Sequence, residues 1–320
     1  MTATPDEYVA YARRGYGMDH EWYRWAPPQT RPPIRWPQGQ PVAVLVVVPL
    51  QWFPLDMAAG PVRVPGGLER PYPDVGMYSL RDYGNRVGSH RVFDVLTDLG
   101  LQASVAVNAA VAERYPILVQ EVQQRGWEVL AHGVDMGTPH HAGIPLEVER
   151  QQVRTALETL NSHVDGPVTG WMSPGRSQSM QTLTLLVEAG LDYVCDWPND
   201  ERPYRMQTPA GPLTSLPVSN ELDDHTIMVE LRHSETSFAE QVIDQLRRLQ
   251  REATPDDGRL LTLTVHPWIS GQPHRIAALR TALQTIAAAG VWSATGAQIV
   301  QICQPMLPPP DEEERPWTSD

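Results

Sequence analysis

Cysteine is scarce in this sequence. Only two cysteines occur among the 320 residues, Cys195 and Cys303, and they do not form a Cys-x-x-Cys pair. A zinc site built from thiolates needs several cysteines at close spacing, and a disulfide framework needs a higher cysteine content. The sequence therefore argues against both.

Positive charge is also in short supply. There are 25 Lys and Arg residues against 38 Asp and Glu residues, so the formal net charge is −13 at pH 7. A chain of this charge is repelled by phosphate backbones and by anionic lipid surfaces, which argues against nucleic acid and membranes as partners. We expect the partner to be a small-molecule substrate.

Long apolar runs are missing as well. No segment approaches the roughly 18 consecutive apolar residues that a membrane span requires. The first residues, Met-Thr-Ala-Thr-Pro-Asp-Glu-Tyr, show neither the basic start nor the apolar stretch of an export signal. We therefore expect a soluble, cytoplasmic protein.

Strand signals alternate with helix signals along most of the chain. The clearest strand is the β-branched run of residues 42–48, which we expect to end at Pro49, and residues 227–231 are predicted as another strand. Asn108 is predicted to cap a short helix. Residues 54–80 read as a long loop. The alternation predicts an α/β fold with a parallel barrel rather than an open sheet.

The sequence divides into three regions. Residues 1–41 are rich in proline and aromatic residues, and we expect them to wrap over the main domain or to form an oligomer contact. Residues 42–304 are predicted to be the (β/α) barrel catalytic domain. Residues 305–320 are acidic and proline-rich, which predicts a disordered tail.

Polar residues recur where the predicted strands end. These positions are Gln51 and Trp52, then His132 and Asp135, then residues 171–176, then Asp196 and Trp197, and finally His266. Because the carboxyl ends of parallel strands meet at one rim of a barrel, these side chains are expected to form a site.

Their chemistry suggests separate roles. One of the two histidines, His132 and His266, could hold a water or a metal while the other protonates a leaving nitrogen as a general acid. Arg176 suits an anion or an oxyanion, because a guanidinium is always charged. Asp196 could orient a histidine or the arginine. A structural salt bridge or helix cap is an equally good reading of each.

An ordered set of segments carries a family resemblance. The segments are residues 81–88, 103–116, 128–133, 170–176, 191–193 with Asp196, 220–224 and 264–273. In this order they resemble the polysaccharide deacetylase (NodB-homology) superfamily, and within it the allantoinase-like and cyclic-imide-hydrolase-like branch. The resemblance implies an irregular seven-stranded (β/α) barrel over about residues 40–300. It also implies a homo-oligomer.

Two departures from the superfamily pattern concern the metal. Metal-dependent members carry an Asp-Asp pair after the first strand, where this chain has Gln51 and Trp52. They also carry two histidines four residues apart, and here Met136 stands four residues after His132. The resemblance therefore implies no metal, since a lone imidazole holds Zn²⁺ poorly. The alternative is one divalent metal such as Zn at His132, with Asp135, His140 and His141 recruited as ligands.

A third departure concerns the general base. The allantoinase-like branch also lacks the second histidine and is thought to work without metal, but it usually keeps a glutamate near the position of Gln51. A glutamine forms hydrogen bonds but does not take a proton at neutral pH. Asp135, Glu221, Asp224 and His132 are the alternative candidates for the base.

Three functions are consistent with these residues. The first is a metal-independent hydrolase of a non-peptide C–N bond in a small cyclic amide, imide or ureide. In it His132 or a nearby carboxylate activates water, Arg176 holds the oxyanion, and His266 protonates the leaving nitrogen. The second is a metal-dependent deacetylase with altered ligands. The third is a diverged barrel that binds a ligand or catalyses a non-hydrolytic reaction. The residues expected to line the substrate are Gln51, Trp52, Arg86, Trp171, Trp197, Glu221 and Asp224.

Overall fold

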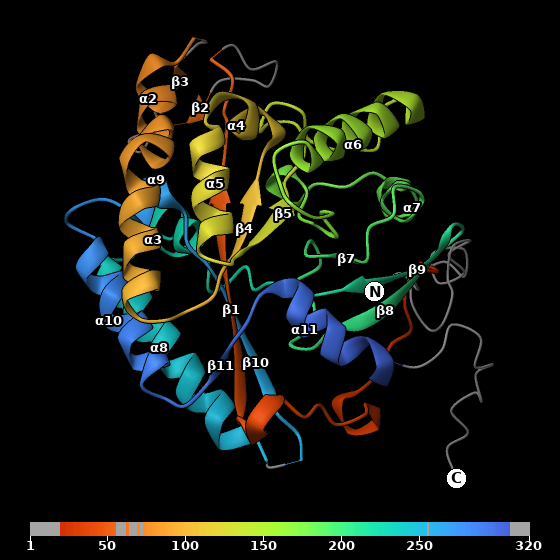
Figure 1. Ribbon diagram of the computed structural model, residues 1–320, viewed down its shortest axis with the longest axis vertical. Coiled ribbons are helices and arrows are strands. Elements are labelled where there is room, and N and C mark those ends of the chain that lie inside the picture. The colour runs from red at the N-terminus through yellow and green to blue at the C-terminus, as the bar shows by residue number, and fades with distance from the viewer. Residues whose placement is uncertain (1–19, 56–61, 64–68, 71–72, 255, 308–320) are drawn as a thin grey trace, which may run out of the picture.

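The strongest strand signal in the sequence forms the centre of the molecule. The computed structural model describes residues 20–55, 62–63, 69–70, 73–254 and 256–307 (Figure 1). Strand β1 (Val42–Leu50) is buried along its whole length, as a β-branched run covered on both faces should be.

Strand β1 belongs to a curled sheet of parallel strands. Seven of them follow one another in the order β10, β1, β4, β5, β6, β7, β9, while β8 pairs antiparallel with β9 and β11 pairs with β1. This is the irregular seven-stranded (β/α) barrel that the sequence predicts. The strands are β4 (Ser104–Val107), β5 (Glu128–Ala131), β6 (Gly170–Trp171), β7 (Tyr193–Val194), β8 (Tyr204–Thr208), β9 (Gly211–Ser215), β10 (Arg259–Thr264) and β11 (Trp292–Ser293). A separate small hairpin pairs β2 (Val62–Arg63) with β3 (Glu69–Arg70).

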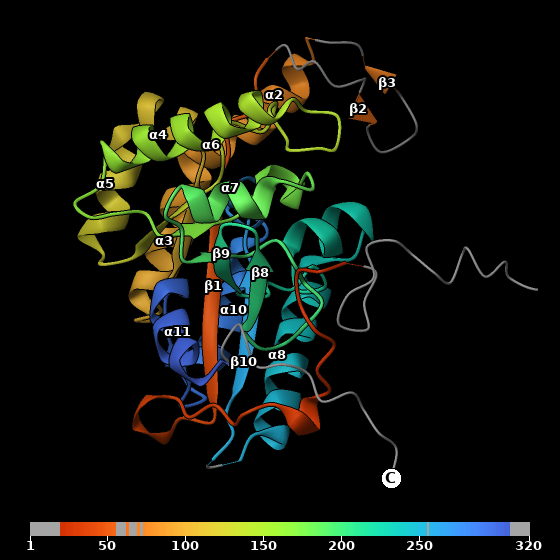
Figure 2. The ribbon, with the colours of Figure 1, turned by 90° about the vertical axis from the view of Figure 1, so that its right-hand side faces the viewer.

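Helices cover the outer face of this sheet (Figures 1 and 2). They are α3 (Ser89–Asp98), α4 (Ala109–Arg114), α5 (Pro116–Gln124), α6 (Leu146–Asn161), α7 (Thr182–Glu188), α8 (Glu235–Glu252), α9 (Pro267–Ser270) and α10 (Ile276–Ala287). Helix α2 (Val75–Tyr83) runs into α3 through a π-helical turn, η3 (Gly84–Gly88), and a second π-helical turn is η5 (Thr226–Glu230). Short 3-10 turns are η1 (Pro28–Thr30), η2 (Pro37–Gly39), η4 (Pro174–Arg176) and η6 (Gln304–Met306).

The sheet separates two apolar cores. Alternate strand residues such as Val46 and Leu263 point outward and pack under the helices, whereas Leu45 and Leu130 point into the barrel. The inner core also contains Ile299 of helix α11 (Gly296–Cys303), which closes the amino-terminal end of the barrel. This alternation decides which side chains reach the interior at the opposite, carboxyl-terminal rim.

The ring of strands has one seam. Strands β9 and β10 do not pair with each other, and the segment of residues 216–223 bridges them instead. The contacts are an isolated bridge between Asp223 and Thr264 and a hydrogen bond from the Ser219 nitrogen to Thr262 Oγ1 (2.9 Å). The barrel is therefore closed at this point by loop and side-chain contacts.

Three local expectations were wrong. Strand β1 runs two residues past residue 48, because the nitrogen of Pro49 faces the side where β10 has already ended at Thr264 and no ladder bond is lost. Residues 227–230 lie in a π-helical turn that ends before Leu231, rather than in a strand, and the Ile227 nitrogen donates to the carbonyl of the preceding Asp223. Residues 75–80 belong to helix α2, so the predicted loop over residues 54–80 ends earlier.

The described part of the N-terminal region lies against the barrel. The Trp36 indole is buried, and its Nε1 donates to the Arg259 carbonyl at the start of β10 (2.8 Å). Trp22 accepts a bond from the Gln207 nitrogen on edge strand β8 (2.6 Å). The predicted disordered tail falls mostly on residues 308–320, which lie outside the described residues. Residues 1–19 also lie outside the described residues. Within the described ranges, every helix is too short or too polar to span a membrane.

Candidate active site

The carboxyl-terminal rim of the barrel gathers polar side chains on its inner face. Gln51 continues the inward series of Leu45, Val47 and Pro49 along β1, and His132 follows Leu130 by the same two-residue step. His266 stands two residues after Thr264 on β10, the neighbour of β1. The structure thus brings Gln51, His132 and His266 to one rim, as the sequence predicts.

His132 is a neutral imidazole with a fixed tautomer. Its Nδ1 lies 2.7 Å from the carbonyl oxygen of Met172, which can only accept, so Nδ1 carries the proton. Burial lowers the pKa of His132 to about 4, and the charge of His266 acts in the same direction. Nε2 therefore presents a lone pair, and it lies 3.2 Å from Nε2 of Gln51. A group this weakly basic is a poor base for activating water.

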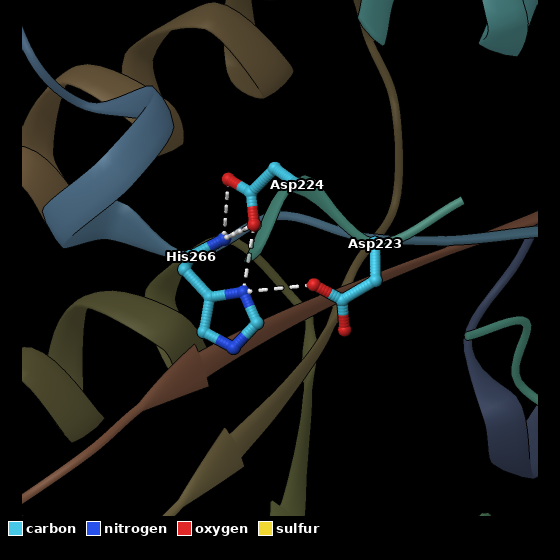
Figure 3. Close-up of side chains that lie close together, drawn as sticks. All are labelled: Asp223, Asp224 and His266. Atoms are coloured by element: carbon cyan, nitrogen blue, oxygen red, sulfur yellow. Dashed lines mark hydrogen bonds and ion pairs between the residues drawn. The ribbon is translucent and has the colours of Figure 1, made fainter. Parts of the chain in front are cut away.

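His266 has the opposite environment (Figure 3). Its Nδ1 lies 2.7 Å from Oδ1 of Asp224 and 3.4 Å from Oδ1 of Asp223. Asp224 is completely buried and also accepts bonds from the His266 nitrogen (2.9 Å) and from Ser270 Oγ (2.5 Å). Figure 3 shows Nε2 on the far side of the ring from both carboxylates. Asp224 therefore orients His266 and leaves Nε2 available for chemistry.

The charge of this pair follows from its neighbours. Burial alone would lower the pKa of His266, but the carboxylates of Asp223 and Asp224 outweigh it and raise that pKa above its ordinary value of 6.5. The pKa of His132 is therefore lowered and that of His266 is raised. Such separation is typical of groups that exchange protons with a substrate.

Asp223 and Asp224 have roles that the sequence did not reveal. Asp224 was expected to line the substrate, but its oxygens are fully engaged by His266 and Ser270. Asp223 was not singled out, although its carboxylate faces both His266 and Arg176. The consecutive Asp-Asp pair was the available signal, but only the isolated bridge to Thr264 places it beside β10.

The guanidinium of Arg176 forms hydrogen bonds with the seam segment, residues 216–223. Its guanidinium donates to the carbonyls of Val218 (2.6 Å) and Ser219 (3.3 Å) and to the Asn220 side chain, and it lies 3.8 Å from Asp223 Oδ2. These contacts hold the seam segment against the turn after β6, and Nη2 also donates to Thr264 Oγ1 on β10 (3.4 Å). The predicted role of Arg176 at an oxyanion stays a prediction, and few of its N–H groups are left for it.

The two other predicted catalytic carboxylates, Asp196 and Asp135, accept hydrogen bonds from loop residues. Asp196 is buried and accepts bonds from the Ser173 nitrogen and hydroxyl (both 2.7 Å) and from Gln178 Nε2 (2.6 Å). Burial raises its pKa, although these hydrogen bonds oppose the shift. Asp135 accepts from the Gly137 nitrogen (2.9 Å) within its own turn. Neither contacts His132 or His266 among the described residues.

The remaining residues that were predicted to line the substrate lie in different parts of the structure. Trp171 is completely buried on the outer face, where its Nε1 donates to Ser173 (2.8 Å), so it packs in the core. The Trp52 ring also turns outward, toward Tyr115. Trp197 packs against aromatic residues of the N-terminal region, while Glu221 is exposed and Arg86 lies at the surface 3.9 Å from Asp82. Of the expected substrate residues, Gln51 contacts His132 and Asp224 contacts His266.

Two asparagines hold the peptide between Gln51 and Trp52 from opposite ends. Asn85 Nδ2 donates to the Gln51 carbonyl (2.8 Å), and the Trp52 nitrogen donates to Asn108 Oδ1 (2.8 Å). Asn108 also donates to the His132 carbonyl. It stands at the start of α4, but its side chain joins two strands instead of capping the helix as expected.

The donor set at His132 does not fit a metal. Its Nδ1 donates to a carbonyl, its Nε2 faces an amide, and within the described residues it belongs to no group of three convergent donors. His140, one of the expected substitutes, is buried beside Glu149 at 3.1 Å. Asp223, Asp224 and His266 do converge, and His266 Nδ1 lies 2.7 Å from Asp224 Oδ1, a hydrogen-bond distance.

Comparison with known proteins agrees with the fold. A family model described as "Polysaccharide deacetylase" matches residues 73–194. A Schizosaccharomyces pombe (strain 972 / ATCC 24843) protein named "Putative polysaccharide deacetylase" is 23% identical over 256 residues, which cover 72% of this chain and 77% of that one.

Solved structures extend the match to most of the barrel. The structure of PuuE allantoinase has a TM-score of 0.77 at 21% identity, over 86% of this chain and 95% of its own. A structure named "probable Polysaccharide deacetylase" from Pseudomonas aeruginosa PAO1 has a TM-score of 0.78 at 20% identity, over 91% and 96% of the two chains. These matches identify a polysaccharide deacetylase domain over residues 73–194, within a barrel that has the fold of the two solved structures.

Proposed function

We propose that this protein is a metal-independent hydrolase that opens a non-peptide C–N bond in a small cyclic amide, imide or ureide. The observation that carries the proposal is the His266–Asp224 pair at the barrel rim, with Nδ1 held at 2.7 Å and Nε2 turned away from both carboxylates. An imidazole oriented through one nitrogen by a buried carboxylate transfers protons through the other.

One imidazole can serve both halves of the reaction. Neutral His266 takes a proton from water at Nε2 as the water oxygen bonds to the substrate carbonyl carbon. The imidazolium then gives that proton to the ring nitrogen as the C–N bond breaks. Water is thereby split between the carbonyl carbon and the nitrogen, and His266 returns to its neutral form. Asp223 and Asp224 favour the imidazolium that forms in between.

This scheme removes the need for a carboxylate after the first strand. The other candidates for the general base are poorly placed. Both carboxylate oxygens of Asp224 already accept hydrogen bonds from His266 and Ser270. Asp135 accepts a hydrogen bond within its own turn, and Glu221 is exposed. A leaving nitrogen needs a proton to depart, which matches the raised basicity of His266. PuuE allantoinase, a solved structure with this fold, supports a cyclic ureide-type substrate.

The test is a ring-opening screen with wild-type protein and His266→Ala. We expect wild type to open at least one ring among succinimide, hydantoin and allantoin. The variant should lose about 10²- to 10⁴-fold in kcat/KM, the usual contribution of an acid–base group. Equal turnover by both proteins would refute the scheme. Activity confined to N-acetylated sugars would instead point to a deacetylase.

A further inference from the structure

The side chain of Gln51 has only one orientation compatible with its neighbour. Nδ1 of His132 carries the proton because it faces the Met172 carbonyl, so Nε2 of His132 can only accept. Gln51 lies 3.2 Å from that lone pair and must present its amide N–H₂ group to it. The amide oxygen, Oε1, consequently points away from His132.

That oxygen is open to a ligand. Oε1 makes no hydrogen bond with any residue that the structure describes, and it is not among the buried side-chain oxygens that lack a partner. The backbone beneath it is fixed, because Asn85 and Asn108 hold both ends of the peptide that follows Gln51. Gln51 therefore presents an acceptor in a fixed place without rearrangement on binding.

The position of Gln51 relates it to the proposed acid–base group. Strands β1 and β10 are neighbours, and their register pairs Val47 with Thr264. The Val265 nitrogen still donates to the Val47 carbonyl (2.9 Å), so His266 leaves β10 beside the end of β1 that leads to Gln51. Gln51 also lies 3.2 Å from His132, whose pKa the charge of His266 lowers, so Gln51 and both histidines belong to one rim.

We propose that Gln51 determines substrate specificity by accepting the N–H of an unsubstituted cyclic imide or ureide through Oε1. The assignment rests on the proposed function. Accepting that hydrogen turns the nitrogen so that its developing lone pair faces His266 Nε2 when the C–N bond breaks. A ring with a methyl group on the same nitrogen cannot make this bond and leaves the Gln51 oxygen without a partner.

The experiment compares succinimide with N-methylsuccinimide in wild type and in Gln51→Met, by ring opening and by calorimetric binding. Met keeps the length of the side chain and removes both the acceptor and the N–H₂ group that faces His132. Wild type should prefer the N–H ring by about 10- to 100-fold in kcat/KM, and Gln51→Met should reduce that ratio to about 1 by losing activity on succinimide alone. Gln151→Met, an exposed glutamine on α6, is the matched control and should keep the wild-type ratio.

The outcomes separate the two claims. If Gln51→Met opens rings with the wild-type preference, or if wild type does not distinguish the two rings, Gln51 is not the specificity residue and the proposed hydrolase survives. If wild type neither binds nor opens either ring nor any ring of the wider screen, the proposed function and the assignment fall together. Thermal unfolding of each variant confirms that the comparison is between folded proteins.

Discussion

At the scale of single residues, the site consists of two histidines with opposite electrostatic surroundings. His132 meets a carbonyl and an amide, which cannot compensate the burial of a charge, and its pKa falls to about 4. His266 is buried too, yet two carboxylates reverse the effect. The same residue type at the same rim is thus a fixed hydrogen-bonding group in one place and a proton carrier in the other.

This difference predicts a pH dependence. Because His266 must be neutral to accept a proton from water, kcat/KM should fall as the pH drops through its pKa, which lies above 6.5. Asp223→Asn removes the largest single charge effect that raises that pKa, so the acidic limb of the profile should move to lower pH. A profile of kcat/KM from about pH 5 to 9 measures it. A limb in the same place in both proteins would show that another group titrates.

The donor set predicts insensitivity to chelators. His132 has its lone pair facing Gln51, and Met136 stands where a second imidazole ligand would be needed. Activity after prolonged dialysis against EDTA should therefore remain within about twofold of the untreated protein. A loss restored by Zn²⁺ or Co²⁺ would return the metal-dependent deacetylase to first place.

The rim positions of the two histidines could be predicted from the sequence. The side of the sheet on which each tryptophan lies could not. His132 and His266 each follow an apolar strand, which is a local signal. The strands of this barrel are apolar on both faces, so no alternation shows whether Trp52 or Trp171 points inward. Likewise, Asp224 is joined to His266 across 42 residues, and only the seam brings them together.

At the scale of elements, the π-helical turn η3 packs against the segments that carry Gln51 and His266. Turn η3 packs on helix α9, directly after His266, with so little space that a Cβ on Gly88 would lie 2.0 Å from the Pro267 carbonyl oxygen. The same turn supplies Asn85, which holds the Gln51 carbonyl. One turn thus links the ends of β1 and β10, and π-helical turns are frequent at functional sites.

The close contact predicts the effect of a single methyl group. Gly88→Ala should lower the free energy of unfolding by about 2–3 kcal/mol, because the clash is with backbone and no side chain can move away. Urea denaturation measures the change. Gly166→Ala is the matched control, since nothing lies within 4 Å of its Cβ, and it should be nearly neutral. A neutral Gly88→Ala would mean that α9 moves freely.

The second π-helical turn, η5, shows where sequence patterns mislead. Four of the five residues 227–231 are apolar, and two of them, Ile227 and Val229, are β-branched, which is typical of a strand. In the structure the preceding Asp223 is paired with Thr264, and a helical turn starts from its carbonyl. Tertiary contacts therefore override the propensity of this segment.

At the scale of the whole molecule, the described N-terminal region is part of the barrel core. Trp36 is 3% exposed and lies over Gly258, where a Cβ would come within 2.5 Å of its ring. Its ring also lies 5.5 Å from that of Trp292 on β11. Sequence composition set this region apart, but its packing joins it to the amino-terminal end of the barrel.

This packing predicts one cooperative unit. Trp36→Ala should reduce the free energy of unfolding by about 3–5 kcal/mol, the usual loss for a buried tryptophan. Trp25→Ala, at a residue that is 60% exposed, should change it by less than about 1 kcal/mol. Denaturation followed by circular dichroism and by fluorescence should give one midpoint per variant. Separate midpoints would show that the region folds independently.

The seam between β9 and β10 has a consequence for how such barrels diversify. Elsewhere the ring is closed by backbone pairing, which no single substitution removes. At the seam the backbone pairing is reduced to an isolated bridge between Asp223 and Thr264, and the Arg176 guanidinium adds side-chain contacts to the segment. A single substitution of Arg176 or Asp223 can change the shape of the rim at the seam while the other strands keep their pairing. New substrate ranges can therefore evolve at the seam without passing through an unfolded ancestor.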